Sequence, residues 1–230
     1  MNLRNSLKLA WILGPVMGYF LSVVSAARGE AEATWNPDLE VGRPFIRNFT
    51  PRDFEGHSQS FGAVQDSRGV AYFTNYGAVM EYDGADWKRI RIPGTSFVYG
   101  LAIDADDILY VGALGQLGLI RDQGAAGKVF VSLVEHVPED KRPLLNEIWD
   151  IHATPDGVYF MTSRMVLRWR DGKFDVWTPE TEKILYGHWT GSRFLLQNVG
   201  HGLFELIDDA FVQVSDDPVF VKAGPRMMRD

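Results

Sequence analysis

The segment Ile148-Trp-Asp-Ile-His-Ala-Thr-Pro-Asp-Gly-Val-Tyr-Phe160 decides the fold class, because its pattern returns along the chain. It holds an apolar run, a polar turn and a second apolar run, which together are typical of a β-hairpin. A short loop, an alternating run from Val166, the turn Asp171-Gly172 and the aromatic residue Phe174 follow. The whole unit therefore predicts four short strands joined as a meander.

Three further segments, which begin at Phe61, Gly100 and Tyr186, show the same order of features. The unit returns after roughly 40 residues, apart from an insertion at Glu135–Leu145, and this period is typical of a β-propeller blade. A β-sandwich is the alternative, since its strands are also evenly spaced. It does not explain why Asp, Gly and aromatic positions return in the same order, so we favour the propeller.

We expect an all-β chain in which a partial propeller spans residues 58–230. The expected blades have four strands each and lie at about residues 58–92, 97–134, 146–178 and 185–215. Propellers usually contain about 4–8 blades, and the residues after 215 resemble the start of another blade. The sequence therefore predicts an incomplete ring, as in the N-terminal part of a longer protein.

The first 27 residues have the pattern of a secretory signal peptide. Arg4 and Lys8 precede an apolar stretch from Leu9 to Ala27 that ends in small residues, as signal peptidase requires. An uncleaved membrane anchor is the alternative, because the stretch is close to the spanning length of about 20 residues. We expect export to the periplasm, with residues 28–57 as a lead-in to the propeller.

Composition excludes several classes of function. Hydrophobic residues make up 46% and charged residues 23%, which favours a folded soluble domain over disorder. The net charge of -7 argues against binding a nucleic-acid backbone. There is no cysteine, which rules out disulfides, thiolate metal sites and a cysteine nucleophile. No phosphate loop, dinucleotide fingerprint, nucleophile elbow or zinc motif occurs, so we expect neither an enzyme nor a cofactor.

Histidine and aspartate positions have mainly structural interpretations. The five histidines lack the spacing of zinc ligands, and His152 alternates with apolar residues in a strand, which favours a structural role. Asp104–Asp107 resembles a calcium loop but lacks the glycine and the distant glutamate of an EF-hand. We interpret it as a hairpin turn, like Asp83-Gly84 and Asp171-Gly172.

The topology of a blade predicts a binding surface. The loop between the second and third strands and the residues leading into the first strand open on one face, around the axis. Amide, hydroxyl and aromatic groups gathered there suit a polar, uncharged ligand such as a sugar. The alternative is that these are solvated loops whose aromatic rings pack between blades. The candidate ligand-binding residues are Gln59, Asn75, Tyr76, Tyr99, Gln116, Trp149, Arg164, His188, Asn198 and His201.

Several segments between Val41 and Leu119 carry a family resemblance. They are Gly42–Phe49, Gln65–Gly69, Tyr72–Asn75, Glu81–Gly84 with Trp87, and Ile108–Gly112 with Gly118-Leu119. Weaker matches run through Trp149 to Phe204. This stretch resembles the N-terminal sensor region of bacterial two-component-regulator propeller proteins, which also contain a triple-tyrosine domain.

The resemblance implies a periplasmic sensor propeller, followed in the full-length chain by a triple-tyrosine β-sandwich, a transmembrane helix and a cytoplasmic output module. The output is a histidine kinase, a nucleotide cyclase or a DNA-binding regulator. We expect a small-molecule or oligosaccharide ligand, the downstream domains as partners, and association as a homodimer. A stand-alone periplasmic binding propeller is one alternative. A polysaccharide lyase or glycosidase is another, although only Glu147 is a loop carboxylate suited to acid–base work.

Overall fold

The computed structural model describes residues 46–178 and 184–222. The expected signal segment and most of the lead-in lie outside the described residues, as do residues 179–183 and 223–230. Residues from Asn48 onward belong to one compact unit.

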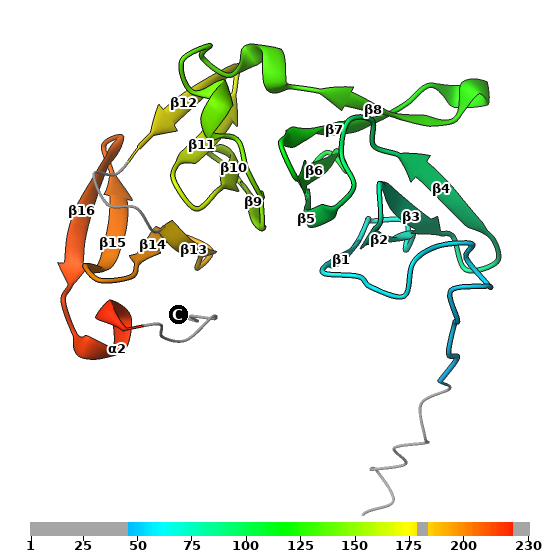
Figure 1. The fold of residues 1–230 in the computed structure, drawn as a ribbon, viewed down its shortest axis with the longest axis horizontal. Helices are drawn as coiled ribbons and strands as arrows, with labels where there is room; N and C mark the ends of the chain where they lie inside the picture. The colour runs from blue at the N-terminus through cyan, green and yellow to red at the C-terminus, as the bar shows by residue number, and fades with distance from the viewer. Residues whose placement is uncertain (1–45, 179–183, 223–230) are drawn as a thin grey trace, which may run out of the picture. The chain divides into compact units, whose positions relative to one another are not determined.

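Within the described residues, four antiparallel sheets of four strands each follow one another (Figure 1). In every sheet the strands are hydrogen-bonded in chain order, so each is a simple meander, as the repeats predicted. Blade 1 contains β1 (Ala63–Gln65), β2 (Ala71–Asn75), β3 (Ala78–Tyr82) and β4 (Trp87–Arg91), and blade 2 contains β5 (Val98–Ile103), β6 (Leu109–Ala113), β7 (Gln116–Asp122) and β8 (Lys128–Ser132). Blade 3 contains β9 (Asp150–Thr154), β10 (Gly157–Met161), β11 (Val166–Arg170) and β12 (Lys173–Trp177), and blade 4 contains β13 (Ile184–Trp189), β14 (Phe194–Asn198), β15 (Gly202–Ile207) and β16 (Ala210–Ser215).

Aspartate and glycine form the tight turns that the sequence predicts. Asp171 and Gly172 have φ angles of 52° and 78° between β11 and β12, a conformation that these two residue types tolerate best. In the Asp104–Asp107 segment, Asp104 Oδ1 accepts hydrogen bonds from the backbone N–H groups of Asp106 and Ile108, at 3.0 and 2.9 Å. The carboxylate therefore closes a turn, which confirms the interpretation of this segment as a hairpin.

A tyrosine on the second strand reinforces this turn in three blades. The Tyr72 hydroxyl lies 3.2 Å from Asp66 Oδ2, and the Tyr110 hydroxyl lies 3.2 Å from Asp104 Oδ2. Tyr159 makes the corresponding contact in blade 3. Each ring also belongs to the buried core, so one side chain joins the turn to the packing between blades.

The core consists of the layers between consecutive blades. Tyr72 and Val111 are buried between blades 1 and 2, and the innermost strands β5, β9 and β13 lie beside one another. Between blades 3 and 4, Tyr159 of β10 stacks on Phe194 of β14 with ring centroids 4.1 Å apart. Gly187 of β13 permits a close approach there, because any side chain at this position would collide with Met161.

The series of blades does not close into a ring (Figure 1). A short helix, α2 (Pro218–Val221), follows β16 and is capped by Asp217, whose Oδ1 accepts the N–H of Val219 at 2.9 Å. The 3-10 turns are η1 (Gly124–Ala126), η2 (Val134–His136) and η3 (Arg142–Leu144), and the last two lie at the expected insertion. Within residues 46–178 and 184–222, no helix has the length and apolarity to cross a membrane.

Candidate functional site

Aromatic rings from three consecutive blades form one continuous surface. Tyr99 lies 4.1 Å from Trp149, and Phe61 lies 5.2 Å from Tyr99 and 5.5 Å from Trp149, all between ring centroids. Phe97 continues the series 6.0 Å from Tyr99, and Tyr76 follows 5.1 Å from Phe97. We call these five residues the aromatic surface.

Backbone contacts between neighbouring blades hold the loops of this surface together. Tyr76, in the β2–β3 turn, makes a β-bridge with Phe97, which leads into β5. Leu114, in the β6–β7 turn, donates its N–H to Phe97 O at 3.0 Å and bridges Glu147, which leads into β9. The expected gathering of second-to-third-strand loops with the starts of inner strands is therefore present, and these contacts tie it to the sheets.

The aromatic surface is open to solvent. The relative exposure is 52% for Trp149, 45% for Tyr76 and 41% for Phe61, whereas Tyr99 is at 9% and forms the base beneath them. Burial raises the pKa of the Tyr99 hydroxyl, and the nearby Glu147 carboxylate raises it further. Grouped exposed rings of this kind mark interaction sites more often than isolated apolar residues do.

Asn75 and Gln59 lie beside the aromatic surface. Asn75 is buried, its Nδ2 donates to His57 O at 2.8 Å, and its Oδ1 accepts the His57 N–H at 2.8 Å. This amide therefore positions the chain that leads into β1, where the exposed Gln59 lies. The His57 ring lies 5.8 Å from Tyr76 and continues the ring contacts at this end.

The remaining predicted site residues are not part of the aromatic surface. Gln116 Oε1 accepts a hydrogen bond from Ser132 on the outer strand β8, and Arg164 is exposed in the β10–β11 turn. In blade 4, His188 and Asn198 are buried in β13 and β14, whereas His201 is exposed in the turn after β14. The structure thus brings together Tyr76, Tyr99 and Trp149 of the predicted set, with Asn75 and Gln59 beside them.

Two members of the aromatic surface, Phe61 and Phe97, were not among the predicted site residues. Phe61 precedes Gly62 just before β1, as Tyr99 precedes Gly100 in β5, so the recurring aromatic residue before glycine was the signal for Phe61. Phe97 lies two residues before Tyr99, at a position that the repeat does not mark. Their contacts across blades depend on the packing of the sheets, which the repeat alone does not specify.

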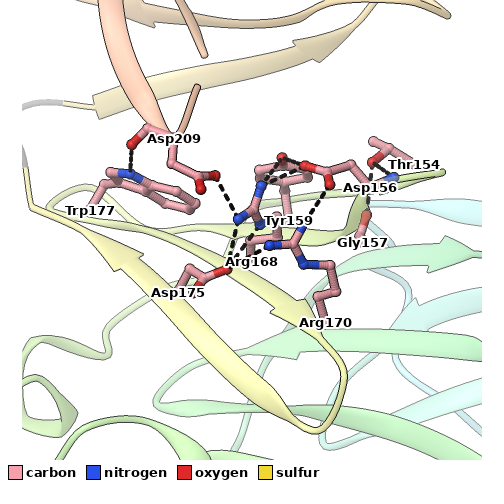
Figure 2. A network of polar contacts seen from close by, with 9 residues as sticks. All are labelled: Thr154, Asp156, Gly157, Tyr159, Arg168, Arg170, Asp175, Trp177 and Asp209. Atoms are coloured by element: carbon pink, nitrogen blue, oxygen red, sulfur yellow. Dashed lines mark hydrogen bonds and ion pairs between the residues drawn. The ribbon is translucent and has the colours of Figure 1, made fainter. Parts of the chain in front are cut away.

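Apart from the aromatic surface, a network of polar contacts centred on Arg168 of β11 joins blades 3 and 4 (Figure 2). The Arg168 side chain is 3% exposed, and its guanidinium contacts Asp156 at 2.5 Å, Asp175 at 2.7 Å and Asp209 at 2.7 Å. Asp209 belongs to the β15–β16 turn of blade 4, and its backbone carbonyl accepts the indole N–H of Trp177 at 2.7 Å. The guanidinium also lies 5.2 Å from the centre of the Trp177 ring.

Two arginines and three aspartates are in contact in this network. Burial raises the pKa of Asp156, but the hydrogen bond from Tyr159 and the positive charge of Arg168 outweigh it, so the pKa lies below its ordinary value. A related contact joins blades 1 and 2, where Lys128 Nζ lies 2.7 Å from Glu81 Oε2 and 2.8 Å from the Tyr72 hydroxyl. These cations are engaged by acids of the same chain, which indicates a role in joining blades.

Comparisons with known proteins address the fold. No protein-family profile matches the chain, and no curated protein matches it significantly. Among solved structures, the extracellular domain of a B. thetaiotaomicron protein named as a hybrid two component system is similar, with a TM-score of 0.50 and 14% identity. The chain is a partial β-propeller. The match covers 68% of this chain and 22% of that one, so the chain spans less than a quarter of its length.

Two further propellers show weaker likeness. The Dos1 propeller has a TM-score of 0.49 and 14% identity, over 64% of this chain and 43% of that one. The WD40 β-propeller domain of Doa1 has a TM-score of 0.48 and 12% identity, over 70% of this chain and 60% of that one.

Proposed function

We propose that the chain is the extracytoplasmic ligand-sensing propeller of a transmembrane signalling protein that regulates transcription. It binds a carbohydrate-like ligand on the aromatic surface, and it passes the signal to an output module in downstream domains of the same protein. The observation that carries this proposal is a solvent-exposed series of rings contributed by three blades. Export by the N-terminal signal segment would place this surface in the periplasm.

The chemistry of the surface suits a sugar ring. The C–H faces of a pyranose stack on flat aromatic rings. Trp149 and Tyr76 are half-exposed and offer such rings, and Tyr99 and Phe97 connect them through ring contacts. The loops that carry them are bonded to neighbouring blades, so little conformational entropy is lost when the ligand binds. The carboxylate of Glu147, whose charge acts on Tyr99, and the amide of the exposed Gln59 can bond ligand hydroxyls.

Signalling follows from the division of the surface between blades. Phe61 leads into blade 1, Tyr99 belongs to blade 2 and Trp149 leads into blade 3. A ligand that touches all three favours one relative placement of these blades over others. The output responds only if the ligand binds that placement more tightly, because a ligand shifts an equilibrium by its difference in affinity.

A thermal-shift screen of the exported chain against neutral and acidic oligosaccharides tests this function. We expect at least one glycan to raise the melting temperature, and we expect Trp149→Ala and Tyr76→Ala to abolish the increase. Val212→Ala is the matched control, because Val212 is 46% exposed but lies on β16 of blade 4. If no glycan stabilises the chain, or if the control variant loses the effect equally, the proposal is wrong.

A further inference from the structure

The inner strand of blade 3 binds one residue of blade 4 through both its backbone N–H and its backbone carbonyl. The backbone N–H of Gly187 on β13 donates to Asp150 Oδ2 at 3.2 Å, and the Gly187 carbonyl lies 2.8 Å from His152 Nε2. His152 Nε2 also lies 3.2 Å from Asp150 Oδ1. We call this pair of β9 side chains the Asp150–His152 clamp.

The clamp is particular to this junction. His152 lies opposite Tyr159 in the register of its blade. The corresponding positions in blades 1 and 2 are Val64, opposite Tyr72, and Ala102, opposite Tyr110. Neither of those side chains can form a hydrogen bond or carry a proton, so the titratable contact belongs to the junction of blades 3 and 4.

The groups around His152 favour its protonated form. Burial lowers the pKa of His152, but the Asp150 carboxylate and the Gly187 carbonyl outweigh burial, so the pKa is raised. On β13, His188 is also titratable: burial lowers its pKa, the Asp150 carboxylate raises it in part, and the charge of His152 lowers it, so the pKa lies below its ordinary value. On β10, the Tyr159 hydroxyl is bonded to Asp156, and from β14 the Phe194 ring faces the imidazole at 6.1 Å.

We propose that the Asp150–His152 clamp is a proton-dependent junction between blades 3 and 4, and that it regulates the aromatic surface through Trp149. Trp149 directly precedes Asp150, so the group that binds Gly187 also anchors the start of β9 and the ring before it. Protonated His152 is a cation that pairs with Asp150 while it donates to Gly187. Neutral His152 keeps a hydrogen bond to the carbonyl but no longer attracts the carboxylate, and the junction loosens.

The direction of the pH response follows from the raised pKa. The contribution of His152 is fully present below its unfolded pKa of about 6.5, and it is lost as the pH rises through the higher folded value. His188 acts in the opposite sense, because its lowered pKa makes its protonation unfavourable to the folded state at acidic pH. The clamp is therefore tightest in mildly acidic solution and weakens as the solution becomes alkaline.

NMR on the whole chain tests the clamp without any ligand. We expect the Gly187 amide and the Trp149 indole signals to titrate together, with a common midpoint above the ordinary histidine pKa of about 6.5. After correction for intrinsic exchange, the Gly187 amide should open more often as the pH rises through this titration. The increase should be about tenfold for each pH unit that separates the folded pKa of His152 from the lower unfolded pKa. Trp149→Phe assigns the indole signal.

Two variants make the outcome decisive. His152→Gln keeps a hydrogen-bond donor but cannot titrate, so both signals should become independent of pH, whereas His201→Gln, at an exposed histidine of blade 4, should leave the titration unchanged. If His152→Gln does not fold, Asp150→Asn should shift the midpoint to lower pH. The proposal is overturned if His152→Gln retains the wild-type titration, or if the Trp149 signal ignores the midpoint that Gly187 reports. This inference uses the proposed function only for the role of Trp149, and a failed glycan screen would leave the NMR result standing.

Discussion

Replacing Arg168 with methionine should weaken the junction of blades 3 and 4 more than any single surface substitution. The side chain is 3% exposed and contacts three carboxylates, from the turn after β9, from β12 and from blade 4. Removing one partner of a buried ion pair costs about 3–5 kcal/mol when the remaining charge is left without solvent. Here the three carboxyl side chains are 49%, 32% and 64% exposed and regain water, so we expect about 2–3 kcal/mol.

Urea and thermal unfolding followed by tryptophan fluorescence measure this loss. For a chain of this size the melting temperature should fall by about 2–4 °C for each kcal/mol. Arg170→Met is the matched control, because Arg170 contacts two of the same acids, at 2.6 and 3.7 Å, but its side chain is 38% exposed. Exposed ion pairs contribute about 0–1 kcal/mol, so the control should change little.

The two variants separate burial from simple charge. If Arg168→Met costs no more than Arg170→Met, the network in Figure 2 does not hold the blades together and the reasoning fails. Asp209→Asn adds a further check, since it removes the charge of the blade 4 contact, keeps a residue type that tolerates the φ of 61° at this position, and should cost less than the loss of Arg168.

Two other substitutions test close contacts, and both are measured by equilibrium unfolding. Gly187→Ala places a methyl group against Met161 and should lower the free energy of unfolding by about 1–3 kcal/mol. Adding Met161→Ala to this variant should recover part of that loss. Strictly additive effects of the two substitutions would contradict the contact. Asn75→Ala removes both hydrogen bonds to His57 and should lower the free energy of unfolding by about 1–3 kcal/mol. Limited proteolysis of this variant should show faster cleavage of the segment before β1. Unchanged cleavage would mean that the amide does not position this segment.

Local patterns were sufficient to predict the blades. Each unit carries its own turn chemistry, such as Asp104 closing the β5–β6 turn and Asp171-Gly172 closing the last hairpin of blade 3. These signals act over a few residues, so they survive in a single sequence. The meander then follows, because neighbouring strands joined by tight turns pair with each other.

The site was predictable to the extent that blade topology determines it. Tyr76 lies in the β2–β3 turn, Tyr99 near the start of β5 and Trp149 just before β9. These positions follow from strand order, and the three residues are joined by ring contacts. The network around Arg168 was not predictable, because it depends on Asp209, which is 41 residues away in the next blade. Contacts at such separation depend on how sheets pack, and the repeat pattern does not contain that information.

Hydrogen exchange with mass spectrometry, using the most stabilising glycan, tests the central claim most directly. The account predicts slower exchange in four separate segments from three blades that converge on the aromatic surface: residues 57–62, 74–77, 96–99 and 146–150. In the Trp149→Ala variant, the protection of all these segments should disappear together. Protection confined to one blade, or located in the β14–β15 turn of blade 4, would contradict a ligand site shared by three blades.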